Sequence, residues 1–449
     1  MRRHLLLGRM GPQDSVKPPK ANDEIETVLL LVTGKKRFAF GIGQAIEDLF
    51  KMNVYPSEIG MDLLVLAAHV HAADTRILRN SDSQDGWSRE IRLIVPVSDV
   101  SRWQAVARLL EEMLTFLTGD HWIIGFRARP KGFAQIVPAR PANTPEPIFD
   151  RLNLFSGGLD SLIGGIEALE AGGIPLFISH AGEGAVSRAQ SACYEGLVAA
   201  YGQKRLARLR VSMKFSVDLV KGGGHEETTR GRSFQFFAAA VFAGSGFHAP
   251  FTVNVPENGF IALNVPLDPL RLGALSTRTT HPFYMARWNE LIAALGITGR
   301  VYNPHWNQTK GEMVAVCHNA PLLMSLVKSS ISCSSPAKGR FARHAAGHCG
   351  YCLPCIIRRA ALQPADPTHY ESPLQGRPLN TRTAKGKQVR SFQFAVQRLS
   401  AKPQLAAILI HKAGPLGDEP AHLNELADVY RRGLTEVGAL LQGVIAKPR

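Results

Sequence analysis

The segment from residue 149 to about 304 alternates short apolar runs with helical patterns, and this alternation limits the possible folds more than any other feature of the chain. Apolar runs at 152–155, 174–179, 206–211 and 251–255 predict strands. Helical patterns lie between them, at 162–170, 186–201 and 234–244. Strands that alternate with helices predict an α/β fold with a parallel, doubly wound sheet, in which ligands bind at the carboxyl ends of the strands.

The regions on either side of this segment have different patterns. Residues 1–148 mix expected strands at 28–32, 91–97 and 121–126 with a helical pattern at 103–117, which predicts an N-terminal α+β domain. Prolines at 138, 141, 145 and 147 then mark a stiff connection and a domain boundary. Residues 149–362 form the second expected domain. Residues 363–449 form a mainly helical C-terminal extension, with the best helical patterns at 391–399 and 421–441.

The net charge of +15 is concentrated near the C-terminus, where residues 321–449 hold 18 Lys and Arg against 7 Asp and Glu. Such a basic surface can meet nucleic acid, a nucleotide or an acidic protein, or it can simply be solvated. No apolar run approaches the ~20 residues of a membrane-spanning helix. The leucine run at 5–7 is also shorter than the apolar part of a secretory signal. We therefore expect a soluble, cytoplasmic protein without membrane partners.

The segment Ser156-Gly157-Gly158-Leu159-Asp160-Ser161 lies between an expected strand and an expected helix. Its glycines let the backbone approach an anion, and free amide groups at the helix start favour bound phosphate. Its serines can donate hydrogen bonds, whereas Asp160 would repel phosphates unless it holds magnesium or orients a loop donor. A glycine-rich turn with Asp and Ser caps is the alternative. The missing Walker lysine excludes that NTPase class.

In this strand–loop–helix setting, the hexapeptide resembles the pyrophosphatase loop of the PP-loop ATPase superfamily. The resemblance implies an adenine nucleotide alpha hydrolase-like, Rossmann-like sheet in which residues 156–161 bind ATP and Mg²⁺. It also implies that ATP is cleaved between its α and β phosphates. Members of the superfamily adenylate a carbonyl or carboxyl oxygen, and an amine, ammonia or sulfur nucleophile then displaces AMP. We also assign His180, at the end of the next expected strand, to the nucleotide site.

Four of the six cysteines lie within 23 residues, at Cys333, Cys349, Cys352 and Cys355. Four thiolates suit tetrahedral zinc, and a site closed by four sulfurs leaves no position for a catalytic water, so we expect a structural metal. His344 or His348 could replace one sulfur, and chance clustering of buried thiols is the remaining alternative. The isolated Cys193 and Cys317 are expected to be small core residues.

A PP-loop followed by Cys and then by Cys-Gly-x-Cys-x-x-Cys resembles the QueC family of 7-cyano-7-deazaguanine synthases, over roughly residues 150–360. The resemblance implies zinc binding and adenylation of the carboxylate of 7-carboxy-7-deazaguanine. Ammonia then gives an amide, and a second ATP drives dehydration to the nitrile.

Two weaker matches to this family add candidate catalytic residues. Lys310, in the segment 308–314, would neutralise the α-phosphate or the departing pyrophosphate. Its alternative is an exposed lysine at a helix N-terminus. Arg232, in the segment 230–233, could clamp phosphate or the substrate carboxylate, or belong to a solvated basic turn.

Polar residues after the strand at 251–255 are candidates for the substrate end of the pocket. Glu257 and Asn258 could bind a guanine-like edge, because a carboxylate accepts from ring NH and exocyclic NH₂ groups. Arg278 or His281 could meet the reacting carboxylate. Turn and cap chemistry is the alternative for each of them.

The chain departs from a stand-alone QueC enzyme by its long regions before the loop and after the cysteines, and by a longer spacing between the first two cysteines. This extended architecture resembles QueC-like proteins of bacterial antiphage defence systems of the Qat type. It suggests that an adenylated deazaguanine-type acid is passed to an amine on a partner protein from the same operon. Nitrile synthesis for queuosine-type metabolism, PP-loop modification of tRNA and a non-catalytic nucleotide-binding subunit remain as alternatives.

Overall fold

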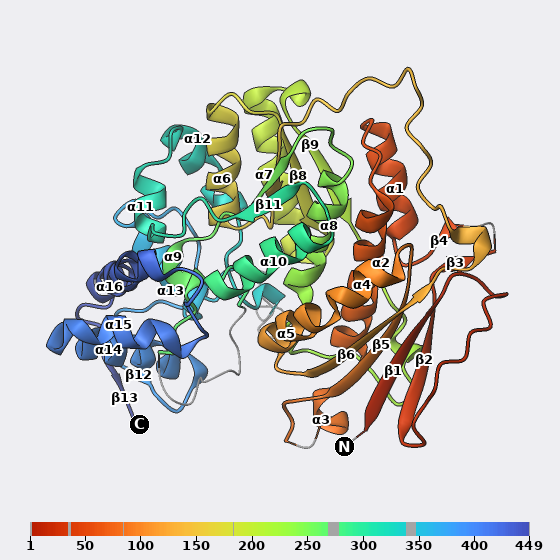
Figure 1. Cartoon of the computed structure of the whole chain (residues 1–449). Helices are drawn as coiled ribbons and strands as arrows, with labels where there is room; N and C mark the ends of the chain where they lie inside the picture. Colours follow the sequence, from red (N-terminus) through yellow and green to blue (C-terminus); the bar gives the residue numbers. More distant parts are fainter. Residues whose placement is uncertain are drawn as a thin grey trace.

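The computed structural model describes residues 2–34, 37–83, 85–182, 184–267, 278–337 and 347–448. Figure 1 shows two parallel sheets with helices packed around them, and C-terminal helices on the side of the central sheet opposite to the N-terminal sheet. The predicted α/β class with parallel sheets is therefore confirmed.

The N-terminal sheet has the strand order β2-β1-β5-β6, and all of its neighbouring strands are parallel. The strands are β1 Arg3–Arg9, β2 Glu24–Leu30, β5 Glu90–Val97 and β6 His121–Ala128. The helices of this region are α1 Ile42–Lys51, α2 Glu58–Arg76, α3 Arg79–Asp82, α4 Val100–Ala105 and α5 Ala107–Thr118. The predicted α+β class is wrong for this region, because all neighbouring strands of the sheet are parallel. An irregular segment connects β1 to β2, and helices lie in the connections to β5 and β6.

The central sheet has the order β11-β10-β7-β8-β9 and is also parallel throughout. Its strands are β7 Arg151–Leu154, β8 Pro175–His180, β9 Ala207–Val211, β10 Phe251–Asn254 and β11 Gly299–Tyr302. Its helices are α6 Leu159–Glu170, α7 Gly184–Tyr201, α8 Arg232–Gly244 and α10 Pro282–Ala294. The chain builds outward from β7 to one side and then returns to form β10 on the other. The strand order thus reverses between β7 and β10, where ligands bind in open α/β sheets.

The two sheets share one hydrophobic core, although prolines mark the connection between them along the chain. Helix α2 is buried continuously from Gly60 to Thr75 and packs against α8 of the central sheet. Residues of both sheets, from Leu6 to Val301, belong to a single buried apolar cluster. The boundary near residue 148 is therefore a change of sheet rather than a break in the core.

The C-terminal extension folds around a second apolar core. Helices α13 Leu353–Leu362, α14 Ala384–Ala401 and α16 Leu423–Leu440 enclose it, and residues 260–267 contribute to it from the central domain. The short strands β12 Leu379–Asn380 and β13 Ala446–Lys447 pair beside it. The remaining short elements are β3 Val32–Thr33, β4 Arg37–Phe38, α9 Gly259–Ala262, α11 Lys310–Ala315, α12 Ala320–Leu326 and α15 Ala406–Leu409.

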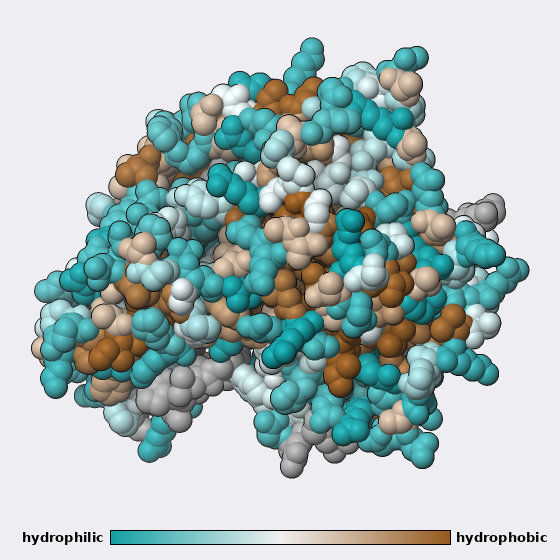
Figure 2. All heavy atoms as spheres, in the orientation of Figure 1, coloured by the Kyte–Doolittle hydropathy of each residue, from teal (hydrophilic) through white to brown (hydrophobic). Residues whose placement is uncertain are grey.

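Hydrophilic residues cover most of the face seen in Figure 2, and apolar residues are scattered among them. Among the described helices, none combines the length and the apolar character needed to cross a membrane.

Candidate functional site

The glycine-rich segment forms the turn from β7 into α6, at the carboxyl edge of the central sheet. Gly157 adopts φ +77°, and a Cβ there would lie 2.7 Å from the backbone nitrogen of Gln190, so both conformation and space require glycine. The Ser156 hydroxyl lies 3.2 Å from that of Ser161 and 3.3 Å from the amide nitrogen of Gly158. Main-chain N–H groups and two hydroxyls thus converge at the N-terminus of a 12-residue helix, an arrangement that favours a bound anion.

Asp160 is held by residues from two other segments. The ammonium of Lys310 lies 2.9 Å from its Oδ1 atom, and only 4% of the lysine side chain is exposed. Asn258 donates to Oδ2 through its side-chain amide at 2.7 Å and through its backbone N–H at 3.2 Å. The alternative interpretation of Lys310, as an exposed lysine at a helix N-terminus, is therefore wrong. The structure places its charge beside the glycine-rich turn, with Asp160 as its anchor.

The position of Lys310 depends on the C-terminal helix α16. Lys310 is the first residue of α11, which begins with a capping box formed by Thr309 and Glu312. Glu436 of α16 accepts hydrogen bonds from the Thr309 hydroxyl and, at 3.3 Å, from the Gly311 backbone N–H. The sequence pattern alone did not single out Glu436, because 126 positions separate it from Lys310 and its own helix is amphipathic in the ordinary way.

Glu257 lies beside the same group of charges. A Cβ on Gly164 of α6 would lie 2.3 Å from Pro256, so a glycine at this position lets the segment after β10 approach α6 closely. The Thr280 hydroxyl donates to the Glu257 carboxylate, and the Glu257 backbone is paired with Asn303. Burial, and to a smaller extent the nearby charge of Asp160, raises the pKa of Glu257 to about 7.

Arg278 and His281 have other partners in the structure. The Arg278 guanidinium donates to the Phe116 carbonyl at 2.7 Å and lies 4.6 Å from the centroid of the Phe116 ring. His281 caps α10 by accepting the Phe283 backbone N–H through Nδ1, and it is fully buried. Burial lowers its pKa to about 3. Arg278 thus connects the central domain to α5, and His281 caps the helix α10 that follows it.

His180 and Arg232 lie at the carboxyl edge of the sheet, near β8 and β9. The His180 ring is buried, and its centroid is 5.7 Å from that of His71 on α2. Burial and then the charges of nearby groups, including Arg232, lower the pKa of His180 to about 3. The N-terminal region therefore contributes His71 to the surroundings of His180, a residue that the sequence pattern did not indicate.

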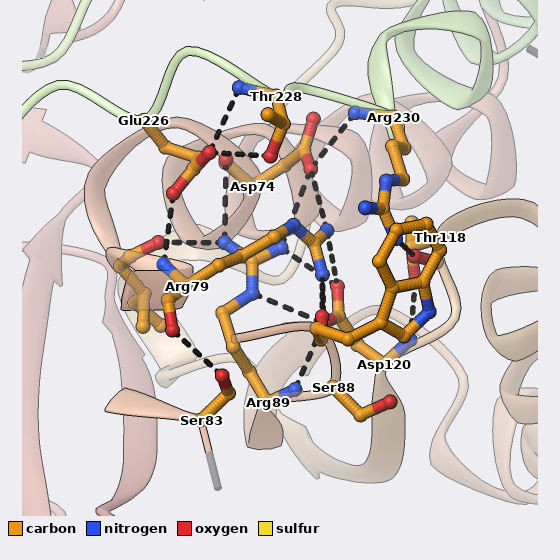
Figure 3. Close-up of polar contacts among 12 residues, drawn as sticks. Asp74, Arg79, Ser83, Ser88, Arg89, Thr118, Asp120, Glu226, Thr228 and Arg230 are labelled. Carbon is orange, nitrogen blue, oxygen red and sulfur yellow. Dashed lines mark hydrogen bonds and ion pairs between the residues drawn. The ribbon is translucent and has the colours of Figure 1, made fainter. Parts of the chain in front are cut away.

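The segment that leads into Arg232 is fixed by a buried network of charges (Figure 3). Asp74 of α2 accepts the backbone N–H groups of Arg230 and Gly231, at 3.1 and 2.8 Å. Arg89, which is fully buried, donates to Asp120 at 2.7 Å and lies 3.4 Å from Asp74. Because the carboxylates and guanidinium groups pair with one another, the network anchors the start of α8 to the N-terminal sheet.

Four sulfurs form a candidate metal centre next to this site. The Sγ atoms of Cys333, Cys349, Cys352 and Cys355 all lie within 4.8 Å of one another. The Cys333–Cys352 and Cys349–Cys355 pairs are 3.9 and 4.0 Å apart. A tetrahedral zinc with Zn–S bonds of about 2.3 Å separates its sulfurs by roughly 3.8 Å. The four cysteines could therefore hold a metal such as zinc.

The other candidate ligands do not join this cluster. His348 uses Nε2 to accept the Ser332 backbone N–H at 3.1 Å, so it has a structural hydrogen bond in place of a ligand role. His344 lies outside the described residues. Cys193 and Cys317 are buried in a separate apolar cluster, as predicted. Burial raises the pKa of Cys193 to about 12 and that of Cys317 to about 11, so both thiols stay protonated near neutral pH.

No family model, curated protein or solved structure matches this chain.

Proposed function

We propose that the chain is an ATP-dependent, AMP-forming ligase that adenylates the carboxylate of a 7-deazaguanine-type acid. The observation that carries this proposal is the convergence of Asp160, Lys310 and Asn258 on the glycine-rich turn at the point where the strand order reverses. A fixed cation, main-chain donors and hydroxyls at one sheet edge form a site suited to the charge of a departing pyrophosphate. The substrate class in this proposal comes from the resemblance to the QueC family, which rests on the order of the loop and the four cysteines along the chain.

The proposed reaction has two bond changes. A substrate carboxylate oxygen attacks the α-phosphorus of ATP, and the bond to the β-phosphate oxygen breaks to release pyrophosphate. An amine nitrogen then attacks the acyl carbon, AMP leaves with the bonding electrons, and the amine loses a proton. ATP would bring Mg²⁺, which neutralises phosphate charge when bound. Lys310 would stabilise the negative charge on the phosphates, and Asp160 and Asn258 would keep the ammonium in place.

The acceptor that we favour is an amine on a partner protein in a bacterial antiphage defence system. The N-terminal sheet and the C-terminal helices support this choice, because they add surface on both sides of the central sheet to which a partner protein could bind. Ammonia as the acceptor, with later dehydration to a nitrile, is the alternative product route.

The test is incubation of the purified full chain with ATP, Mg²⁺ and 7-carboxy-7-deazaguanine, with and without ammonia. We expect release of AMP and pyrophosphate that depends on the acid, and a product identified by mass. Two ATP consumed per product indicate a nitrile, and one indicates an amide. Absence of acid-dependent pyrophosphate release, in a protein that binds ATP, would refute the adenylation. An unmodified neighbouring protein after co-expression with the active enzyme would refute the transfer.

A further inference from the structure

The segment at residues 330–333 lies between the phosphate loop and the four-cysteine cluster, and it contacts both. The Ile331 backbone N–H donates to the Gly157 carbonyl at 2.8 Å. The Leu159 backbone N–H, at the start of α6, donates to the Ser332 hydroxyl oxygen at 3.3 Å. The next residue, Cys333, supplies one of the four sulfurs. A shift of this cysteine would therefore move groups that touch the phosphate loop.

Arg358 holds the same segment from the other side. It lies on α13, one turn after Cys355, and none of it is exposed. Its guanidinium donates to the hydroxyls of Ser330 and Ser332, at 2.9 and 3.2 Å, and to the Val327 carbonyl at 2.7 Å. Among the ion pairs of the described residues, none joins Arg358 to a carboxylate. A buried positive charge thus lies behind Ser332, between the loop and the sulfurs.

Among the described residues, the Ser332 hydroxyl has no acceptor for its own proton. Its oxygen accepts hydrogen bonds from both Leu159 and Arg358. A hydroxyl can also donate one hydrogen bond, yet within the described parts of the chain no acceptor for that proton is found among the hydrogen bonds of Ser332. A Cβ on Gly158 would lie 3.8 Å from this hydroxyl oxygen, so the free donor is next to the glycine backbone that would receive an anion.

We propose that Ser332 is a further phosphate-binding residue, with Arg358 as its positioning residue, and that metal held by the four cysteines sets the affinity of the loop for pyrophosphate. This inference rests on the proposed function, because it assumes that the loop binds the diphosphate part of a nucleotide. The free hydroxyl donates to a phosphate oxygen, and the buried guanidinium polarises that hydroxyl. A bound metal would connect Cys333 to Cys355 of α13, the helix that also carries Arg358. It would in this way hold Ser332 beside the loop.

Direct binding of inorganic pyrophosphate with Mg²⁺, measured by calorimetry on the zinc-loaded full chain, tests the role of Ser332. We expect Ser332→Ala to bind about ten- to a hundredfold more weakly, the loss typical of one hydrogen bond to a charged group. Its zinc content should equal that of the wild type, whereas its unfolding temperature should fall, because the Leu159 N–H and the Arg358 guanidinium lose an acceptor. The matched control is Ser334→Ala, because Ser334 is exposed and follows Cys333 directly. Equal affinity in Ser332→Ala and the wild type overturns the role of Ser332.

Removal of zinc by a chelator tests the role of the metal. We expect pyrophosphate affinity to fall at least as far as in Ser332→Ala, with the far-ultraviolet circular dichroism unchanged, and to return when zinc is added back. Unchanged affinity in the zinc-free chain overturns the metal dependence. A wild-type chain that binds neither pyrophosphate nor ATP refutes the proposed function itself. A wild type that binds, with variants that bind equally well, refutes only this inference.

Discussion

Replacement of Lys310 by methionine tests the buried ion pair on which the candidate site depends. The side chains of Lys310 and Asp160 are 4% and 11% exposed, and their charged atoms are 2.9 Å apart. Loss of one partner from a buried pair costs about 3–5 kcal/mol, because the remaining charge is uncompensated. Asp160 keeps two hydrogen bonds from Asn258, so we expect a smaller loss for Lys310→Met, of about 2–3 kcal/mol in the free energy of unfolding.

The double variant Asp160→Asn, Lys310→Met separates charge from packing. Because it removes both charges, we expect it to be destabilised by only about 1 kcal/mol, less than either single variant. Urea unfolding followed by tryptophan fluorescence measures these differences, and Lys328→Met is the control because Lys328 is exposed. The double variant should recover stability without recovering pyrophosphate release. A loss in the double variant equal to the sum of the two single losses, or a Lys310→Met chain as stable as the wild type, would show that the pair is not formed.

Three further perturbations test the surroundings of this pair. The pKa of Glu257 is raised from 4.5 to about 7 in the folded state, so ionisation of Glu257 disfavours that state. The resulting loss in the free energy of unfolding grows as pH rises from 4.5 to about 7. Glu257→Gln should therefore be more stable than the wild type at pH 8, by on the order of 1–3 kcal/mol, and the two should converge below pH 5; a pH-independent difference in urea unfolding would contradict this. Glu436→Ala should cost about 1–3 kcal/mol of stability, because two donors beside Lys310 lose their acceptor, and it should raise the KM for ATP. Glu425 is exposed on the same helix, so Glu425→Ala should change neither quantity. Equal effects of the two variants would count against a specific role of Glu436. Cys352→Ser should lose the bound zinc, measured by mass spectrometry of the metal, and several kcal/mol of stability, whereas Cys193→Ala should keep its zinc; retention of a full zinc in Cys352→Ser would argue against a four-sulfur site.

Local sequence patterns were sufficient to predict four of the five strands of the central sheet, but not β11 or the helix α10 before it. The turn at residues 156–161 follows β7 and opens α6 as expected, because glycine and cap residues have strong local preferences. The four cysteines could be grouped because thiolates at short, regular spacing have few structural uses other than metal binding.

Features that depend on tertiary contacts could not be predicted in this way. Helix α2 has no clear polar face, since it is buried from Gly60 to Thr75, and so it lacks the periodicity by which a surface helix is recognised. The class of the N-terminal region was wrong because strand direction depends on connections that a pattern of short runs does not define. Glu436 and Ser332 contact the site through partners that are 125 and 173 residues away along the chain.

The regions before and after the central sheet are integral to the geometry of the candidate site. Asp74 from the N-terminal region fixes the start of α8, and Glu436 from the C-terminal helix fixes the segment that carries Lys310. The apolar residues of 260–267, which begin two positions after Asn258, belong to the core that the C-terminal helices enclose. Separation of that core from the central sheet would expose apolar surface and at the same time release two of the three segments that meet at Asp160. Stability and site geometry are therefore coupled in this chain, so the loss of either flanking region should affect ligand binding as well as folding.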